Sequence, residues 1–255
     1  MVLNRTVFFQ AINIVAFIVT LAVNGLAGST TMLNGVTSGE VSDMYPTLVT
    51  PAGFTFSVWG VIYMLLLVFV VYQALPKNRD KPFLQQIGLF FALSGACNVS
   101  WLFLWHYNLV TYSLVLMLAL LASLILIYLR LDIGRAAVSL KEMTCVHLPF
   151  SVYLGWISIA TIANVSVALT AVGWDGFGIE PVTWAVVIIC VALLLSLAML
   201  VARKDIAFSL VVVWALIGIL AKQGGNETIV LASEIGIVLI LAAVGVTVAF
   251  SRLKR

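Results

Sequence analysis

The sequence predicts an all-α polytopic membrane helix bundle with about eight transmembrane helices, and two observations carry this prediction. The chain is 63% hydrophobic and only 9% charged over 255 residues, with a mean hydropathy of +1.18. Soluble domains carry about a quarter charged residues, so this composition excludes the soluble class. Apolar runs of about 20 residues, which is the length that crosses a bilayer, alternate with short polar breaks.

Eight apolar runs define the expected helices. The first run has the position of a signal peptide, but it is too long and no convincing cleavage site follows, so we interpret it as a retained helix. The break at 106–108 is short enough to require a tight antiparallel hairpin, and the seventh run is short. The expected spans are 7–27, 53–75, 85–105, 109–129, 148–171, 182–202, 206–221 and 228–250.

Basic residues gather on one side of the expected membrane. With a cytoplasmic N-terminus, twelve of the thirteen Lys and Arg residues fall in inner loops, and only Lys222 falls outside. The positive-inside rule therefore predicts that both termini are cytoplasmic. The compact chain, in which no targeting segment is visible, favours a prokaryotic plasma membrane. The inner residues are Arg5, Lys77, Arg79, Lys81, Arg130, Arg135, Lys141, Arg203, Lys204, Arg252, Lys254 and Arg255.

The outer segment from Gly28 to Ala52 is the one long loop near the start of the chain, and it is rich in Gly, Ser and Thr. Long loops in compact membrane proteins often cover a binding site. A passive connector explains the same composition equally well, so both interpretations stay open at this point.

Polar residues within the fifth expected span fall on one helix face. Tyr153, Trp156, Ala160 and Asn164 recur at steps of three, four and four residues. An amide in hydrocarbon is costly without a hydrogen-bond partner, so this face is expected to point into the protein. Similar stripes occur in the other helices, and at about 1.5 Å rise per residue their members lie in the outer half of the membrane. These members are Asn24, Trp59, Asn98, Trp101, Asn164 and Glu234.

An aromatic cavity beneath the long loop would explain why these polar and aromatic residues lie at one depth in the membrane. The alternative is that the Trp residues are interfacial anchors and the Asn residues link helices. We interpret Trp105, Trp174 and Trp184, which lie near span ends, as anchors, and the deeper Trp residues as lining a cavity. Glu234 is the acidic residue that we place inside a span, which makes it a candidate for proton or ligand handling.

No soluble-enzyme motif is visible, so we propose no catalytic residue and expect a non-enzymatic role. The three cysteines, Cys97, Cys145 and Cys190, have no metal-ligand spacing, and we expect no metal site. The formal charge of +3 does not indicate nucleic-acid binding, because the basic residues flank the membrane spans.

Three segments together resemble the TspO/MBR family, the translocator proteins also called tryptophan-rich sensory proteins. The second span, TPAGFTFSVWGVIYMLL, is similar to the family's Pro-rich start followed by Trp59 and Tyr63. The third, CNVSWLFLW, resembles its Asn-x-x-Trp signature, and the fifth, PFSVYLGWISIATIAN, its Trp-x-x-x-Ala-x-x-x-Asn signature. The resemblance covers about residues 1–174, and residues 175–255 would form an additional three-helix membrane segment packed on this five-helix core.

The resemblance implies a pocket beneath the first long loop for tetrapyrroles, sterol-like lipids or other hydrophobic ligands. The candidates that the resemblance implies are a porphyrin or haem-type ligand and, as a partner, a second copy of the chain in a homodimer. The sequence departs from the family at Gly53–Phe54, where a Trp is common, and the fifth span lacks the Tyr-then-Arg pattern of sterol-binding members. The implied ligand-binding residues are Trp59, Tyr63, Asn98, Trp101, Trp156, Ala160 and Asn164.

From these observations we expect a membrane protein that binds a hydrophobic or amphipathic small molecule in an outward-facing aromatic pocket, as a sensor, carrier or transporter. Three alternatives stay open. One is a secondary transporter coupled through Glu234, the second is a membrane enzyme acting on a lipid or tetrapyrrole, and the third is a purely structural subunit.

Overall fold

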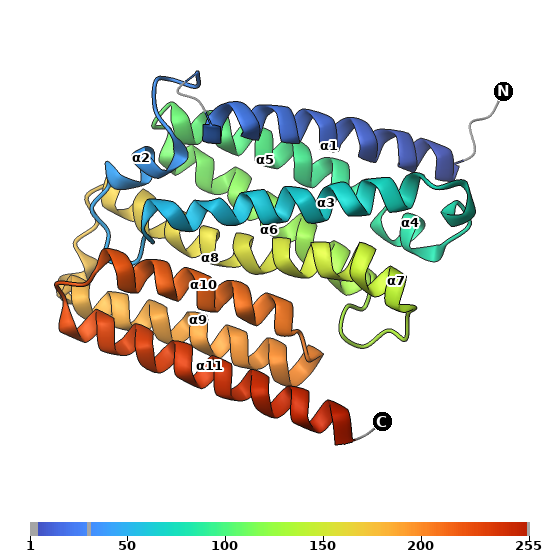
Figure 1. Cartoon of the computed structure of the whole chain (residues 1–255). Coiled ribbons are helices and arrows are strands. Elements are labelled where there is room, and N and C mark those ends of the chain that lie inside the picture. Colours follow the sequence, from blue (N-terminus) through green and yellow to red (C-terminus); the bar gives the residue numbers. More distant parts are fainter. Residues whose placement is uncertain (1–4, 30–31, 254–255) are drawn as a thin grey trace.

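The structure, a computed structural model, describes residues 5–29 and 32–253, and a long helix lies in each of the eight predicted apolar runs (Figure 1). Each long helix is an apolar run bounded by a polar turn. The long helices are α1 (Arg5–Ser29), α3 (Val58–Ala74), α5 (Phe90–His106), α6 (Val110–Arg130), α8 (Leu148–Ala171), α9 (Pro181–Arg203), α10 (Ile206–Lys222) and α11 (Glu227–Leu253).

Short helical turns fill several of the connections between the long helices. They are α2 (Ser38–Asp43), η1 (Gly53–Ser57), η2 (Pro76–Asn78), α4 (Pro82–Ile87), α7 (Leu140–Glu142), η3 (Met143–His147) and η4 (Gly176–Gly178). The predicted continuous third helix, 85–105, is interrupted, because Gly88 adopts φ 54° between α4 and α5. A positive φ is readily available to glycine but ends a regular helix.

Six helical segments of the described residues are long and apolar enough to cross a membrane. The other two long helices, α5 and α10, have 17 residues each and are therefore about 25 Å long. This is slightly less than the bilayer's hydrocarbon core of about 30 Å. The chain is an integral membrane protein with an all-helical bundle.

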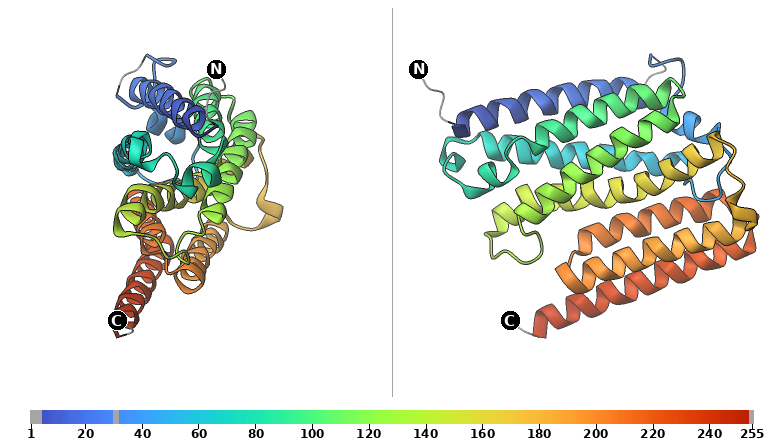
Figure 2. Two further views of the ribbon diagram at one scale, coloured as in Figure 1. Left: turned by 90° about the vertical axis from the view of Figure 1, so that its right-hand side faces the viewer. Right: turned by 180° about the vertical axis from the view of Figure 1, so that it is seen from behind.

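The bundle has two parts that meet at α8. Helices α1, α3, α5, α6 and α8 pack together, with α5 between α1 and α6, and with α8 against α3 and α6. Helices α9, α10 and α11 form a second layer, which contacts α8 through α10 (Figure 2). The division at residue 174 stays a prediction as a domain boundary, although the layer beyond it packs on the rest.

Both described ends of the chain lie at the same end of the bundle, which we call the terminal end (Figure 1). The opposite end, which we call the loop end, carries α2 and the connections α5–α6, α8–α9 and α10–α11. This arrangement follows from an even number of antiparallel crossings.

Helix α8 is the most enclosed of the long helices, and nearly all of its first ten residues are buried. Gly155 permits α10 to approach closely, since a Cβ atom there would lie 3.2 Å from the Phe208 carbonyl oxygen and 3.2 Å from the Val211 Cβ. The layer α9–α11 is therefore held against the face of α8 by close backbone packing.

A buried carboxylate joins the two parts at the terminal end. Asp205, at the N-terminus of α10, accepts hydrogen bonds from the Tyr128 hydroxyl of α6 at 2.8 Å and the Ser151 hydroxyl of α8 at 2.5 Å. It also accepts the Phe208 backbone N–H at 3.0 Å, which caps α10. Sequence analysis placed Asp205 just outside a span and did not single it out, although an Asp directly before an apolar run is typical of a helix cap.

Candidate functional site

Trp59 lies at the centre of an aromatic cluster formed by α3 and α8. Its ring is stacked on Tyr63, one helical turn away, with a centroid distance of 5.5 Å and an interplanar angle of 12°. It meets Tyr153 and Trp156 of α8 edge-on, at 6.0 Å and 6.2 Å. Phe56 also meets Trp156 edge-on, at 5.9 Å. Edge-on packing of this kind fixes the ring orientations.

Two buried amides connect the helices around this cluster. Asn98 of α5 accepts a hydrogen bond from the Asn24 side chain of α1 at 2.6 Å and donates to the Tyr153 hydroxyl at 3.4 Å. Asn164 of α8 accepts the Trp101 indole N–H at 2.9 Å and hydrogen-bonds the Ser113 hydroxyl. The expectation that these amides point into the protein is confirmed, because Asn98 and Asn164 are buried and paired.

These side chains enclose a small cavity, which we call the aromatic cavity, of about 30 Å³. Five of the predicted ligand-binding residues line it: Trp59, Trp101, Trp156, Ala160 and Asn164. Two others, Tyr63 and Asn98, are not in its lining but contact residues around it. The remaining lining residues are Ser42, Thr50, Pro51, Phe56, Trp105, Ile159 and Ala163. Whether these residues bind a ligand stays a prediction.

Trp105 is the residue whose role the sequence analysis misjudged. We interpreted it as an interfacial anchor, but it is buried, lines the cavity and stacks on Trp101 at 5.6 Å. Its indole N–H donates to the Ser38 carbonyl oxygen at 3.2 Å, so it also holds α2 in place. An interfacial anchor and a residue that a loop covers both lie near the end of a span. The position of Trp105 in the sequence therefore could not distinguish the two roles.

Glu234 lies apart from the cavity. It is exposed on α11 and belongs neither to the aromatic cavity nor to the larger groove described below. The neighbouring residue, Ser233, is buried instead, because it lies on the inner face of α11. The predicted role of Glu234 in proton or ligand handling stays a prediction.

Residues 32–52, which we call the covering loop, close the cavity from the loop end; residues 30 and 31 of the predicted loop lie outside the described residues. Ser42, Thr50 and Pro51 of this loop line the cavity. Within the loop, Thr37 and Glu40 form a capping box at the start of α2. The backbone N–H and then the hydroxyl of Thr37 hold the pKa of Glu40 below its usual range.

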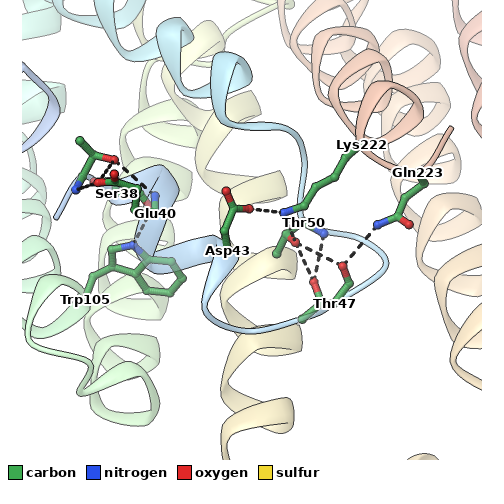
Figure 3. Close-up of polar contacts among 9 residues, drawn as sticks. Ser38, Glu40, Asp43, Thr47, Thr50, Trp105, Lys222 and Gln223 are labelled. Atoms are coloured by element: carbon green, nitrogen blue, oxygen red, sulfur yellow. Dashed lines mark hydrogen bonds and ion pairs between the residues drawn. The ribbon is translucent and has the colours of Figure 1, made fainter. Parts of the chain in front are cut away.

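The covering loop is attached to α10 as well as to α5 (Figure 3). The Lys222 ammonium group lies 2.5 Å from the Asp43 carboxylate and 3.3 Å from the Thr50 hydroxyl. The Gln223 side chain donates to the Thr47 carbonyl oxygen at 3.5 Å. Below these contacts, the Ala52 N–H donates to the Gly218 carbonyl oxygen at 3.0 Å. The second layer therefore helps to hold the loop over the cavity.

The described residues contain no group of three or more His, Cys, Asp or Glu side chains arranged to hold a metal ion. The lining residues carry one amide, two hydroxyls and several indole N–H groups, but the surface that they present to the closed cavity is apolar.

Comparison with known proteins gives one match. The sequence model of the family described as TSPO-like protein matches residues 10–247, which includes helices of both parts of the bundle. No curated protein and no solved structure matches the chain.

Proposed function

Because the chain belongs to the family of TSPO-like proteins, we propose that its aromatic cavity binds an uncharged, largely apolar small molecule that carries a hydrogen-bond acceptor. The observation that carries this proposal is the Trp156 indole N–H. Trp156 lines the cavity, and its indole N–H is buried and has no hydrogen-bond partner among the described residues. In this proposal the protein is a membrane receptor or carrier, and no residue has a catalytic role.

An unpaired donor in a buried wall favours a ligand with an acceptor. Leaving a buried N–H without a partner costs about 1–3 kcal/mol, and a ligand carbonyl or ether oxygen would recover part of this cost. Trp59 and Phe56 both pack edge-on against the Trp156 ring and, like Trp156, line the cavity. Among the described residues, no Lys, Arg or His lines the cavity, which argues against an anionic ligand.

The size of the cavity requires the covering loop to move. A volume of about 30 Å³ is room for about one water molecule, whereas small-molecule sites are about 300–1,000 Å³. The Lys222–Asp43 ion pair is partly exposed, and exposed pairs contribute only about 0–1 kcal/mol. We therefore propose that the covering loop acts as a lid, opening when the ligand enters.

The residues of the closed cavity do not fit a porphyrin. The macrocycle is far larger than 30 Å³, and no described cavity residue supplies a cation for its carboxylates or an imidazole for a central iron. A tetrapyrrole ligand is thus the second candidate, supported by the family membership but not by the cavity wall.

Trp156→Phe is expected to weaken binding of an acceptor-bearing probe about tenfold, because it removes the N–H and keeps an aromatic ring. The probe is 6-propionyl-2-dimethylaminonaphthalene, a neutral ketone whose emission reports the polarity of its site. Its analogue without the carbonyl, N,N-dimethyl-2-naphthylamine, should bind both proteins equally. The measurement is a fluorescence titration of the purified protein in dodecyl maltoside.

Glu234→Gln serves as the matched control, since Glu234 lies outside the cavity wall, and it should leave the ketone's affinity unchanged. A parallel titration with protoporphyrin, followed by quenching of tryptophan fluorescence, tests the second candidate. If protoporphyrin binds more weakly to Trp156→Phe and the ketone does not bind at all, the tetrapyrrole becomes the proposed ligand in place of the neutral molecule. If Trp156→Phe leaves the affinity for the ketone unchanged, the proposed binding site is contradicted.

We further propose that the terminal end faces the cytoplasm, in a prokaryotic plasma membrane. Among the described Lys and Arg residues, Lys222 alone lies near the loop end, whereas the others lie at or near the terminal end. In a cysteine-free variant, Met32→Cys in the covering loop should react with a membrane-impermeant maleimide added to intact cells. Asp80→Cys, in the connection between η2 and α4, should react only after lysis, and the reverse pattern would invert the orientation.

A further inference from the structure

A second, much larger hollow lies on another side of α8. This lateral groove, of about 510 Å³, is formed by the second half of α8, the first half of α9, residues 46–49 of the covering loop and the connection 174–179. Its volume is in the range of small-molecule sites, unlike that of the aromatic cavity. It shares no lining residue with that cavity.

The groove exists because α9 packs chiefly on α10 and α11 and leaves the second half of α8 uncovered on that side. The connection between α8 and α9 is held in shape by two contacts. The Trp184 indole N–H donates to the Gly176 carbonyl oxygen at 2.9 Å, and the Asp175 carboxylate accepts the Phe177 N–H at 3.0 Å. The walls of the groove are therefore fixed by hydrogen bonds as well as by helix packing.

The mouth of the groove combines aromatic rings with a carboxylate. Trp174 and Trp184 lie with ring centroids 5.3 Å apart, and Asp175 follows Trp174 directly. One Asp175 oxygen accepts the Phe177 N–H, and the other has no hydrogen bond among the described residues. Indole faces beside a carboxylate are a recognised environment for ammonium groups, which bind by cation–π attraction.

The polar side chains deeper in the groove offer acceptors rather than donors. The hydroxyls of Thr161, Ser166 and Thr170 each donate to the carbonyl oxygen four residues earlier in α8, at 2.7–3.1 Å. Their oxygen lone pairs remain available to a ligand. No Lys, Arg or His occurs among the described lining residues, so nothing cationic would pair with a negatively charged head group.

The helical part of the remaining lining is apolar and follows α8 and α9 away from the mouth. Ile162, Val165 and Leu169 of α8 face Ala185, Ile188 and Val191 of α9 across the groove. From Pro181 to Val191 the wall of α9 is about 15 Å long, which is enough for a long alkyl chain.

We propose that the lateral groove binds a cationic amphipath, with its ammonium head between Trp174, Trp184 and Asp175 and its alkyl chain between α8 and α9. This site is independent of the ligand proposed for the aromatic cavity. The same head-group chemistry occurs in a free alkylamine and in the choline head of a membrane lipid, and the test below distinguishes them.

The test uses three photoactivatable probes with the same 12-carbon chain and a mid-chain diazirine: an amine, an alcohol and a carboxylate. The full-length protein in dodecyl maltoside is labelled, and the labelled peptides are mapped by mass spectrometry. The amine should label α8 between 161 and 170 and α9 between 185 and 191, and the carboxylate should label them weakly. Competition with lysophosphatidylcholine distinguishes a free alkylamine from a choline lipid as the natural ligand, since this lipid displaces the amine only if the site accepts a choline head group.

Two variants test the parts of the site separately. Val165→Trp fills the groove and should lower amine labelling at least about tenfold, whereas Leu194→Trp, on the exposed face of α9 outside the groove, should not change it. Asp175→Asn keeps an acceptor for the Phe177 N–H and removes the charge, so it should weaken labelling by the amine several-fold and not by the alcohol. Equal labelling by amine and carboxylate, or amine labelling that Asp175→Asn leaves unchanged, would overturn the proposal.

Discussion

Replacing Asp205 by alanine is expected to lower the free energy of unfolding by about 3–5 kcal/mol, because each buried donor left without a partner costs about 1–3 kcal/mol. The substitution leaves three buried donors without their acceptor: the Tyr128 hydroxyl, the Ser151 hydroxyl and the Phe208 N–H. These donors come from α6, α8 and α10, so the loss should loosen the second layer from the first. Thermal unfolding in detergent measures the change.

Two further variants make this result specific. Asp205→Asn keeps one acceptor oxygen but turns an NH₂ group towards neighbouring donors, so its effect should be intermediate. Asp80→Ala, an exposed acidic residue in a connection at the same end of the bundle, should change the unfolding free energy by less than about 0.5 kcal/mol. If Asp205→Ala were as stable as Asp80→Ala, the network would not hold the layers together.

Gly218→Val is expected to free the covering loop from α10 and to speed ligand association about tenfold, because the closed loop would no longer be the dominant state. A Cβ atom at Gly218 would lie 2.8 Å from the Pro51 Cβ and 3.0 Å from the Thr55 Cβ, which is closer than packed carbons tolerate. The same segment is held by the Trp214 indole N–H, which donates to the Thr55 carbonyl oxygen at 2.9 Å. The segment that contains Pro51 and Thr55 must therefore move away from α10 in this variant.

Hydrogen exchange of residues 46–56 and stopped-flow binding of the neutral ketone probe measure this effect. Gly224→Ala is the matched control, since it lies at the same end and a Cβ atom there would meet nothing within 4 Å. Faster exchange without faster association would mean that the covering loop does not limit access to the aromatic cavity. Unchanged exchange would mean that α10 does not hold the loop closed.

Much of the fold was predictable because local sequence specifies it. Apolar runs set the eight long helices, and the spacing of Tyr153, Trp156, Ala160 and Asn164 placed these residues on the inner side of α8. The predicted membrane class and the resemblance to the family are confirmed. The interruption at Gly88 was not predicted, because a lone glycine is compatible with an apolar helix and only its positive φ reveals the break.

The candidate site was predictable in its members but not in its shape. Helix faces and depth brought Trp59, Trp101 and Asn164 to one level, where they line one cavity. The volume of that cavity depends on how Trp105 and the covering loop pack over it, and side-chain packing is not encoded in the period of a helix. The lateral groove depends on the side of α8 that α9 leaves uncovered, which is a matter of helix arrangement.

The sequence by itself determined the class of protein, the number of long helices and the faces that turn inwards, since hydropathy and helical period act over one or two turns. The tertiary structure decided what the last three helices do. Contacts such as Lys222 with Asp43 and Trp214 with Thr55 join residues 179 and 159 positions apart. Such pairs carry no local pattern, because their partners meet only after α8 and α10 have packed together.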